Sequence, residues 1–201
     1  MAKDLRYIRT EKNIKKAFLQ LLQTTTYEKI KINDIIALAE ISRNAFYLHY
    51  YSKDELLDSM IDAFAKQFID AQNDLLQKYQ PPRPTESALE FVHAILHPFF
   101  EDRKTSEQLL KIDYVIRRLA DQLADFFYNS TDKSQLTEKE QLDLKMYAEY
   151  RAYGLFGMLG FVFTSKLSYT ETEMAKLLHS INTGEALISI TPFTQRKATN
   201  P

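Results

Sequence analysis

The sequence predicts an all-α protein, and three observations favour that class. The 201 residues include only four glycines, which is too few for a fold built from tight β-turns. Apolar residues recur at helical spacing along most of the chain, and three Ser/Thr-x-x-Glu capping boxes precede apolar stretches. The chain is 45% hydrophobic and 26% charged, a composition typical of globular proteins with a buried core.

The first third of the chain predicts four helices. Ser42 is a natural N-cap for the third, a short helix in which Phe46 and Tyr50 share one face at i, i+4 spacing. The capping box that begins at Ser52 opens the long fourth helix, which ends before the prolines that follow Tyr79. From the apolar spacing, the expected helices cover about residues 9–23, 32–39, 42–50 and 53–79.

Four more helices are predicted in the rest of the chain. The first begins near Thr85 and ends at Pro98, because proline lacks the amide donor of a helix interior. A second runs from about 106 to 128 on one continuous apolar stripe. Capping boxes at Thr137 and Thr170 open the last two, which end near Thr164 and Ile188.

Several classes of protein are excluded or disfavoured by composition. The absence of cysteine excludes disulfide scaffolds and thiol-ligated metals. The N-terminus is charged rather than apolar, and the longest apolar uncharged stretch, 152–165, is shorter than the roughly 20 residues that span a bilayer. No phosphate-binding glycine loop, nucleophile elbow or zinc-protease motif occurs. We therefore expect a cytoplasmic protein that is no enzyme, lies in no membrane and holds no cofactor.

Charge is unevenly divided along the chain. Residues 1–53 carry ten Lys and Arg against five Asp and Glu, whereas the remainder has a net charge of −6. A basic N-terminal region joined to an acidic remainder indicates that the N-terminal region binds a polyanion such as nucleic acid. A solvated charged face is nevertheless the usual explanation of such an imbalance.

The second and third helices form a helix-turn-helix at about residues 30–50, with the break around Glu40. If Phe46 and Tyr50 face the core, the third helix presents other side chains outward, where they can enter a major groove. Arg favours guanine edges and Asn favours adenine edges, whereas Tyr and Lys usually contact phosphates. The outward residues are Arg43, Asn44, Tyr47 and Leu48.

Several anchors in this region resemble one known family. They are the Ile-Ser start of the third helix, the Phe-Tyr-Leu-His-Tyr block at 46–50 and the Ser-Lys-x-Glu-Leu-Leu start of the fourth helix at 52–57. Over roughly residues 9–60 the chain resembles the DNA-binding domain of the TetR family of bacterial transcriptional regulators. This version of the block is most similar to a Firmicutes branch that includes regulators resembling the dihydroxyacetone kinase activator.

The resemblance implies a role for each matching residue. Tyr47, His49 and Lys53 would contact phosphates, Arg43, Asn44 and Leu48 would face base edges, Ala45 could touch a thymine methyl, and Lys31 could gain a phosphate contact. Two positions depart from the family. Glu40 replaces the usual turn glycine, so either its backbone avoids positive φ or it is strained, and Ala45 replaces a threonine. Core packing for Tyr47, a surface position for His49 and simple solvation for Lys53 stay open as alternatives.

The resemblance also implies three segments and a homodimer. Residues 1–60 would form the helix-turn-helix DNA-binding domain, 61–190 a helical regulatory and dimerisation domain, and 191–201 a flexible tail. The last two helices would pair with their copies as a four-helix bundle, although packing within one subunit is the alternative. The expected interface residues are Tyr153, Gly154, Gly157, Gly160, Phe161, Leu177, Leu178 and Ile181.

An aromatic set in the body is the candidate pocket for an effector, although each member could equally be core. It comprises Phe64, Phe68, Phe91, His93, Tyr114, Arg117 and Tyr150. His93 and His97 lie at metal-ligand spacing, but no acidic partner is identifiable nearby, so we expect no metal.

These observations predict a ligand-responsive repressor that binds a palindromic DNA operator as a homodimer, since a dimer on a promoter blocks polymerase without further apparatus. The small-molecule effector is not identifiable from the sequence. Two alternatives use the same TetR-like fold without an inducer: a scaffold or partner-binding protein, and a transcriptional activator. A scaffold would tolerate changes at Arg43, whereas a DNA-binding regulator would not.

Overall fold

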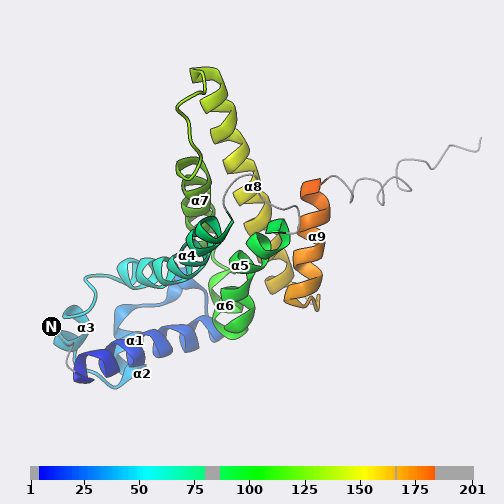
Figure 1. Cartoon of the computed structure of the whole chain (residues 1–201). Helices are drawn as coiled ribbons and strands as arrows, with labels where there is room; N and C mark the ends of the chain where they lie inside the picture. The colour runs from blue at the N-terminus through cyan, green and yellow to red at the C-terminus, as the bar shows by residue number, and fades with distance from the viewer. Residues whose placement is uncertain (1–4, 80–86, 166, 184–201) are drawn as a thin grey trace, which may run out of the picture.

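The computed structural model describes residues 5–79, 87–165 and 167–183, and these residues are all-α, as predicted (Figure 1). The expected tail at 191–201, the prolines after Tyr79 and the end of the last predicted helix near Ile188 lie outside the described residues. The elements are α1 (Leu5–Thr24), a 3-10 turn η1 (Tyr27–Lys29), α2 (Ile32–Ala39), α3 (Arg43–Tyr47), α4 (Lys53–Lys78), α5 (Ser87–Glu101), α6 (Arg103–Leu109), α7 (Asp113–Asn129), α8 (Glu138–Thr164) and α9 (Glu171–Thr183).

Helices α1–α3 form one end of the molecule, which we call the head, and α4 leads from it to the remaining helices, the body (Figure 1). In the head, α1 packs on α2, and α2 contacts α3. Their buried side chains Phe18, Ile35 and Phe46 meet Leu56 and Leu57 from the first turns of α4. Because these residues belong to the same buried cluster as the core of the body, α4 joins the two parts through continuous packing.

In the body, α7 and α8 pack along each other and extend away from the head, while α5 lies between α4 and α9 (Figure 1). Aromatic rings fill the crossing of α4, α5 and α8. The Phe99 ring stacks on Phe64 with centroids 5.2 Å apart, and the Phe156 ring lies 5.7 Å from Phe99 and 5.9 Å from Phe68. Such ring pairs stabilise a core beyond the area that they bury.

The predicted helix starts are confirmed by their side-chain caps. Each capping oxygen accepts a backbone N–H three residues further along, which satisfies one of the free donors of a helix N-terminus. The oxygens and their donors are Ser42 and Ala45 at 3.1 Å, Ser52 and Glu55 at 3.0 Å, Thr137 and Glu140 at 3.3 Å, and Thr170 and Glu173 at 3.2 Å.

In the head, α1 begins at Leu5 rather than near residue 9, and α3 ends at Tyr47 rather than near 50, so Tyr50 lies just beyond it. Two helix boundaries also differ from the prediction in the body. The helix expected over 106–128 is two helices, because the chain breaks at 110–112, where Leu110 and Ile112 are both buried and so continue the apolar pattern. The helix expected to end at Pro98 continues to Glu101, and the Asp102 N–H still bonds the Pro98 carbonyl at 3.3 Å. Proline removes only its own donor, so a buried helix can run through it.

None of the helices in the described part of the chain combines the length and apolar character that crossing a bilayer requires.

Candidate DNA-binding surface

Helix α3 is anchored to the head by two aromatic side chains. Phe46 is fully buried and Tyr50 is 5% exposed, and the Tyr50 hydroxyl lies 3.3 Å from the Glu11 carboxylate on α1. Since Ser42 caps the first turn and these two rings fix the inner side, the orientation of this five-residue helix is determined by the core. The inward placement that the sequence predicts for Phe46 and Tyr50 is confirmed.

The opposite side of α3 is open to solvent. Arg43, Asn44 and Tyr47 are exposed, and Leu48, just after the helix, is 75% exposed. The Arg43 guanidinium lies 5.8 Å from the centre of the Tyr47 ring, so the two side chains form one surface. Ala45 is half-buried. The structure thus brings together the outward residues that sequence reasoning selected.

The turn before α3 uses a left-handed residue. Glu40 has φ 53° and ψ 47°, so of the two alternatives at this non-glycine position the strained one holds. Its N–H bonds the Ala37 carbonyl at 3.3 Å, and the Ile41 N–H bonds the Ile36 carbonyl at 3.3 Å. These bonds close the end of α2 and set the angle at which the chain enters α3.

Lys31 lies at the start of α2 with an exposed side chain. Its backbone N–H donates to the Asp34 carboxylate at 2.9 Å, so Asp34 stabilises the helix start that lysine cannot cap. The Lys31 ammonium is therefore available to an external anion, consistent with the phosphate contact that the family resemblance implies.

Lys53 and His49 have contacts within the chain. The Lys53 ammonium donates to the carbonyls of Tyr27 at 2.7 Å and Ile30 at 3.1 Å, and lies 4.1 Å from the centre of the Tyr27 ring. The His49 ring lies 3.9 Å from the Tyr7 ring on α1. Lys53 thus joins the start of α4 to the η1 turn, a structural role that its sequence context did not indicate, and the phosphate roles of both residues stay predictions.

Comparison with known proteins relates this region to a family. Residues 14–60, about a quarter of the chain, match the pattern described as bacterial regulatory proteins, tetR family. This part of the chain is therefore similar to the TetR family. The match includes all of α2 and α3 and the first turns of α4, which are the elements that position the exposed surface of α3.

Two curated relatives match about a third of the chain. The HTH-type transcriptional regulator YxbF of Bacillus subtilis, itself uncharacterised, is 41% identical over 68 residues, and the dhaKLM operon transcriptional activator DhaS of Lactococcus lactis is 37% identical over 65 residues. These matches include 33% and 32% of this chain, and they span only 18% and 33% of the two relatives' own length.

Solved structures match the whole fold. A TetR-family protein from Syntrophomonas wolfei superposes with a TM-score of 0.63 at 18% identity, covering 95% of this chain and 98% of that one. A TetR transcriptional regulator from Streptococcus agalactiae gives a TM-score of 0.54 at 22% identity, with 90% and 97% covered. At these identities the likeness establishes that head and body together have the TetR-family fold.

Beyond the head, α4 carries three carboxylates at i, i+4 and i+8 that bond other elements. Asp54 accepts the Tyr27 hydroxyl of η1, and Asp58 accepts the Tyr114 hydroxyl of α7 at 2.7 Å. Asp62 accepts the Gln122 amide of α7 at 2.8 Å. The Asp58 bond and partial burial raise the pKa of the Tyr114 hydroxyl. This row of aspartates, which the sequence analysis did not single out, connects the head to α7.

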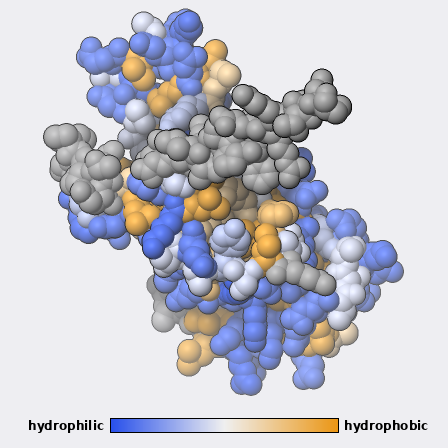
Figure 2. Space-filling model, turned by 90° about the vertical axis from the view of Figure 1, so that its right-hand side faces the viewer, coloured by the Kyte–Doolittle hydropathy of each residue, from blue (hydrophilic) through white to orange (hydrophobic). Residues whose placement is uncertain are grey.

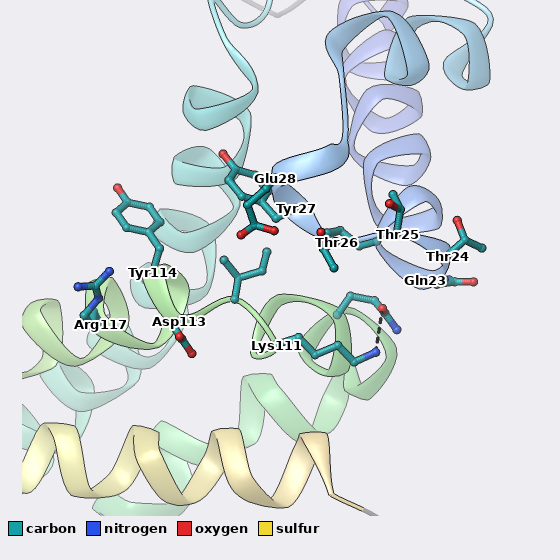
Figure 3. A pocket seen from close by; sticks show the side chains of 13 residues that line it. Gln23, Thr24, Thr25, Thr26, Tyr27, Glu28, Lys111, Asp113, Tyr114 and Arg117 are labelled. Atoms are coloured by element: carbon teal, nitrogen blue, oxygen red, sulfur yellow. Dashed lines mark hydrogen bonds between the residues drawn. The ribbon is translucent and has the colours of Figure 1, made fainter.

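The seven residues of the predicted effector pocket are not brought together. Phe64 and Phe68 belong to the aromatic core, because their rings pack on Phe99 and Phe156, and Tyr150 is 73% exposed on α8. Tyr114 and Arg117 line a cavity of about 640 Å³ where α7 approaches the end of α1 (Figure 3). In that view Lys111, Asp113, Tyr114 and Arg117 lie across from the segment Gln23–Glu28.

Phe91 and His93 lie apart from that cavity, on α5. Phe91 lines a different cavity in the body. His93 Nδ1 lies 2.9 Å and His97 Nδ1 3.2 Å from the two carboxylate oxygens of Glu171, the first residue of α9. Glu171 is the acidic partner that could not be identified from sequence, because it lies 78 residues beyond His93. This contact joins α5 to α9, and among the described residues no cluster of three or more such side chains is arranged to hold a metal.

The predicted dimer residues divide into two groups. Tyr153, Gly154, Gly157 and Phe161 lie on the exposed side of α8, and Ile181 of α9 is 40% exposed. Gly160 is buried, and a Cβ there would lie 2.6 Å from Ile116 Cδ1, so this glycine allows α7 to approach α8 within one chain. Leu178 is 5% exposed in the core, and Leu177 is half-buried. The alternative of packing within a subunit therefore holds for Gly160 and Leu178.

Proposed function

We propose that this protein is a DNA-binding transcriptional regulator whose α3 enters the major groove. The observation that carries the proposal is the two-sided α3. Phe46 and Tyr50 fix its inner side, while Arg43, Asn44 and Tyr47 project from the other side as one solvent-exposed surface. Arg and Asn supply the hydrogen-bond donors that read guanine and adenine edges, and a short helix fits a groove about 12 Å wide. The regulator would act in the cytoplasm, where bacterial DNA lies.

Dimerisation through α8 is the second part of the proposal. Large apolar side chains remain exposed along this helix, and a Cβ added at Gly154 or Gly157 would meet nothing within 4 Å, which leaves room for a second helix. The exposed side chains are Leu142 (58%), Met146 (62%), Tyr147 (55%), Tyr150 (73%), Tyr153 (40%) and Phe161 (64%). A two-fold dimer on this face would present two copies of α3 to half-sites about 34–36 Å apart.

The arrangement of the helices supports separate roles for the two parts of the chain. Residues 1–60 would read DNA, and 61–190 would dimerise and bind an effector whose occupancy changes the separation of the two heads. The first candidate for the mode of regulation is repression, in which the dimer occupies a promoter. Activation is the second candidate, supported by the similarity to DhaS, a transcriptional activator 37% identical over 65 residues.

Figure 2 shows the side of the molecule on which α9 lies, with the head behind the body. Hydrophilic groups cover most of this side, and hydrophobic groups form separate patches.

Selection of bound duplexes from random DNA at near-physiological salt tests the proposal. A palindromic consensus with half-sites about one helical turn apart is expected. The matched control is the Arg43→Ala protein, which should enrich the same sequence weakly and with one position relaxed. If neither protein enriches any sequence, and neither binds duplex DNA at low salt, the assignment as a DNA-binding regulator is overturned and a scaffold role gains support.

A further inference from the structure

One cavity in the body is lined by five helices and has a volume of about 470 Å³, within the range of small-molecule sites. Its wall is formed by Gln72 and Leu76 of α4, Ser87, Ala88 and Phe91 of α5, Phe126 and Phe127 of α7, Ser130 and Thr131 just after it, Leu144, Tyr147, Ala148 and Arg151 of α8, and His179 of α9. Most of this wall is aromatic or aliphatic, and Arg151 supplies the one guanidinium among the described lining residues.

Arg151 lies between two rings. Its guanidinium carbon is 5.8 Å from the centre of the Phe127 ring and 5.6 Å from the centre of the Tyr147 ring, and Nη1 lies 3.2 Å from the Tyr147 hydroxyl. Contacts of this kind hold the guanidinium in place without neutralising it. The side chain is half-buried, so its charge is partly removed from water.

Two arginines of the body have carboxylate partners, and Arg151 differs from them. Arg103 pairs with Glu107 at 2.9 Å, and Arg118 lies 3.7 Å from Asp62. No carboxylate within the described ranges lies at ion-pair distance from Arg151. Arg117 also lines a cavity without a carboxylate at ion-pair distance among the described residues, but it is exposed, whereas Arg151 is half-buried in a mostly apolar wall. A cation placed in this way favours an anionic ligand.

We propose that this cavity binds an amphipathic monoanion, namely a carboxylate on a planar apolar body. The carboxylate would pair with the Arg151 guanidinium, and the apolar body would lie among the rings of Phe91, Phe126 and Phe127. A single guanidinium matches one carboxylate through two parallel hydrogen bonds, whereas a phosphate dianion would require a second permanent cation, which the described wall lacks. This inference rests on the proposed function, since it names the chemical class of the effector.

Isothermal titration of the full chain with 2-naphthoate and 2-naphthamide tests the site, because the two probes share a body and differ in charge. Wild type should bind naphthoate roughly tenfold or more tightly than the amide, as expected for a charge-assisted hydrogen bond. Arg151→Gln should abolish that preference, and Arg151→Lys should retain part of it. Arg117→Gln is the matched control, since this exposed arginine lines another cavity, and it should bind as wild type does.

Equal affinity for the two probes, a preference unaltered in Arg151→Gln, or no heat from either probe at millimolar concentration overturns the proposal. Thermal unfolding of each variant separates loss of binding from loss of fold, and the lysine variant keeps the test valid if the glutamine variant does not fold. Operator binding is measured separately on the same samples. Naphthoate binding without DNA binding would confirm the site and contradict the proposed function. DNA binding without a preference for naphthoate would support the proposed function and contradict the site.

Discussion

Tyr114 of α7 donates a 2.7 Å hydrogen bond to Asp58 of α4, one turn beyond the point where Asp54 accepts the hydroxyl of Tyr27. Because Tyr27 lies in the η1 turn of the head and Tyr114 on a helix of the body, two successive turns of α4 connect the two parts through polar bonds. Apolar packing along α4 does not by itself fix the orientation of its neighbours, whereas these hydrogen bonds fix the angle at which α7 lies against α4. A change in the position of α7 would therefore be transmitted through α4 to the head.

A double-mutant cycle on Tyr114 and Asp58 should reveal the coupling energy between their side chains. Tyr114→Phe and Asp58→Ala should together cost less stability than the sum of the single changes, with a coupling of about 0.5–1 kcal/mol, since Tyr114 is 38% exposed and solvent weakens the bond. Urea unfolding near neutral pH measures it. The pairing of Tyr114→Phe with Asp62→Ala, one turn further along α4, is the control and should couple near zero.

The pH dependence of the same coupling has a definite sign. The pKa of Tyr114 is raised by its bond to Asp58, so the folded state holds this proton more tightly than the unfolded chain does. The stabilisation is therefore fully present below the unfolded pKa of about 10 and is lost as the pH rises through the higher folded pKa. A coupling that grew with pH in this range would contradict the assigned donor.

Arg43→Ala should weaken operator binding by about 1–3 kcal/mol and relax the preference at one base position, because the exposed guanidinium on α3 is placed to read a base edge. Fluorescence anisotropy with a set of single-base operator variants measures both effects. Thermal stability should stay as in wild type, since Arg43 makes only a surface contact with Tyr47. Unchanged sequence preference would show that Arg43 does not contact bases.

Lys53 and Lys31 provide a matched pair. Lys53→Met should lower the free energy of unfolding by about 1–2 kcal/mol, because it removes two charge-assisted hydrogen bonds to the carbonyls of Tyr27 and Ile30. Lys31→Met should leave stability unchanged, since its ammonium is exposed. If each lysine also binds a phosphate, the salt dependence of DNA affinity should flatten by about one unit in each variant. An unaltered salt slope for Lys53→Met, with reduced stability, would restrict that residue to its structural role.

Glu40→Gly should stabilise the protein. Glu40 adopts φ 53°, a conformation that costs an L-residue about 1–2 kcal/mol and glycine almost nothing, although glycine adds entropy to the unfolded chain. The expected gain is about 0.5–1 kcal/mol, equivalent to a rise in Tm of roughly 1–4 °C for a protein of this size. Glu40→Ala, which keeps a Cβ in the same conformation, should show no comparable rise. Equal melting temperatures for both variants would mean that the turn is unstrained.

The head was largely predictable from sequence because its signals are local. The Ser42 cap, the i, i+4 pair Phe46 and Tyr50 and the Ser52 cap each act within four residues, and each is present as expected. The box at Ser52 is not reciprocal, because the Glu55 carboxylate accepts the Tyr51 N–H instead. The exposed surface of α3 followed directly from them. Lys53 shows the limit of this reasoning, because the two carbonyls it bonds belong to a turn more than twenty residues earlier.

The body was predictable as helices but not as a site. Aromatic residue type alone could not separate Phe68, which is fully buried in the core, from Phe91, which lines a cavity, or from Tyr150, which faces solvent. Arg151 was missed for a related reason. Its neighbour Tyr147 is one turn away, but Phe127 and the rest of the wall come from other helices, and only tertiary packing assembles them.

Substitutions at Gly157 and Gly160, one turn apart on α8, distinguish a dimer interface from packing within one chain. A Cβ at Gly157 meets nothing within 4 Å, so Gly157→Leu should leave the fold of one subunit intact while filling the space that a second copy needs. We expect sedimentation velocity to show a shift from dimer to monomer, and DNA affinity to fall with it. Gly160→Ala is the contrasting change. Its Cβ would lie 2.6 Å from Ile116 Cδ1, the end of a side chain that can shift, and alanine favours the helix more than glycine does, so the melting temperature should change little and the dimer should stay in place. A Gly157→Leu protein that sediments as wild type does would place the interface elsewhere.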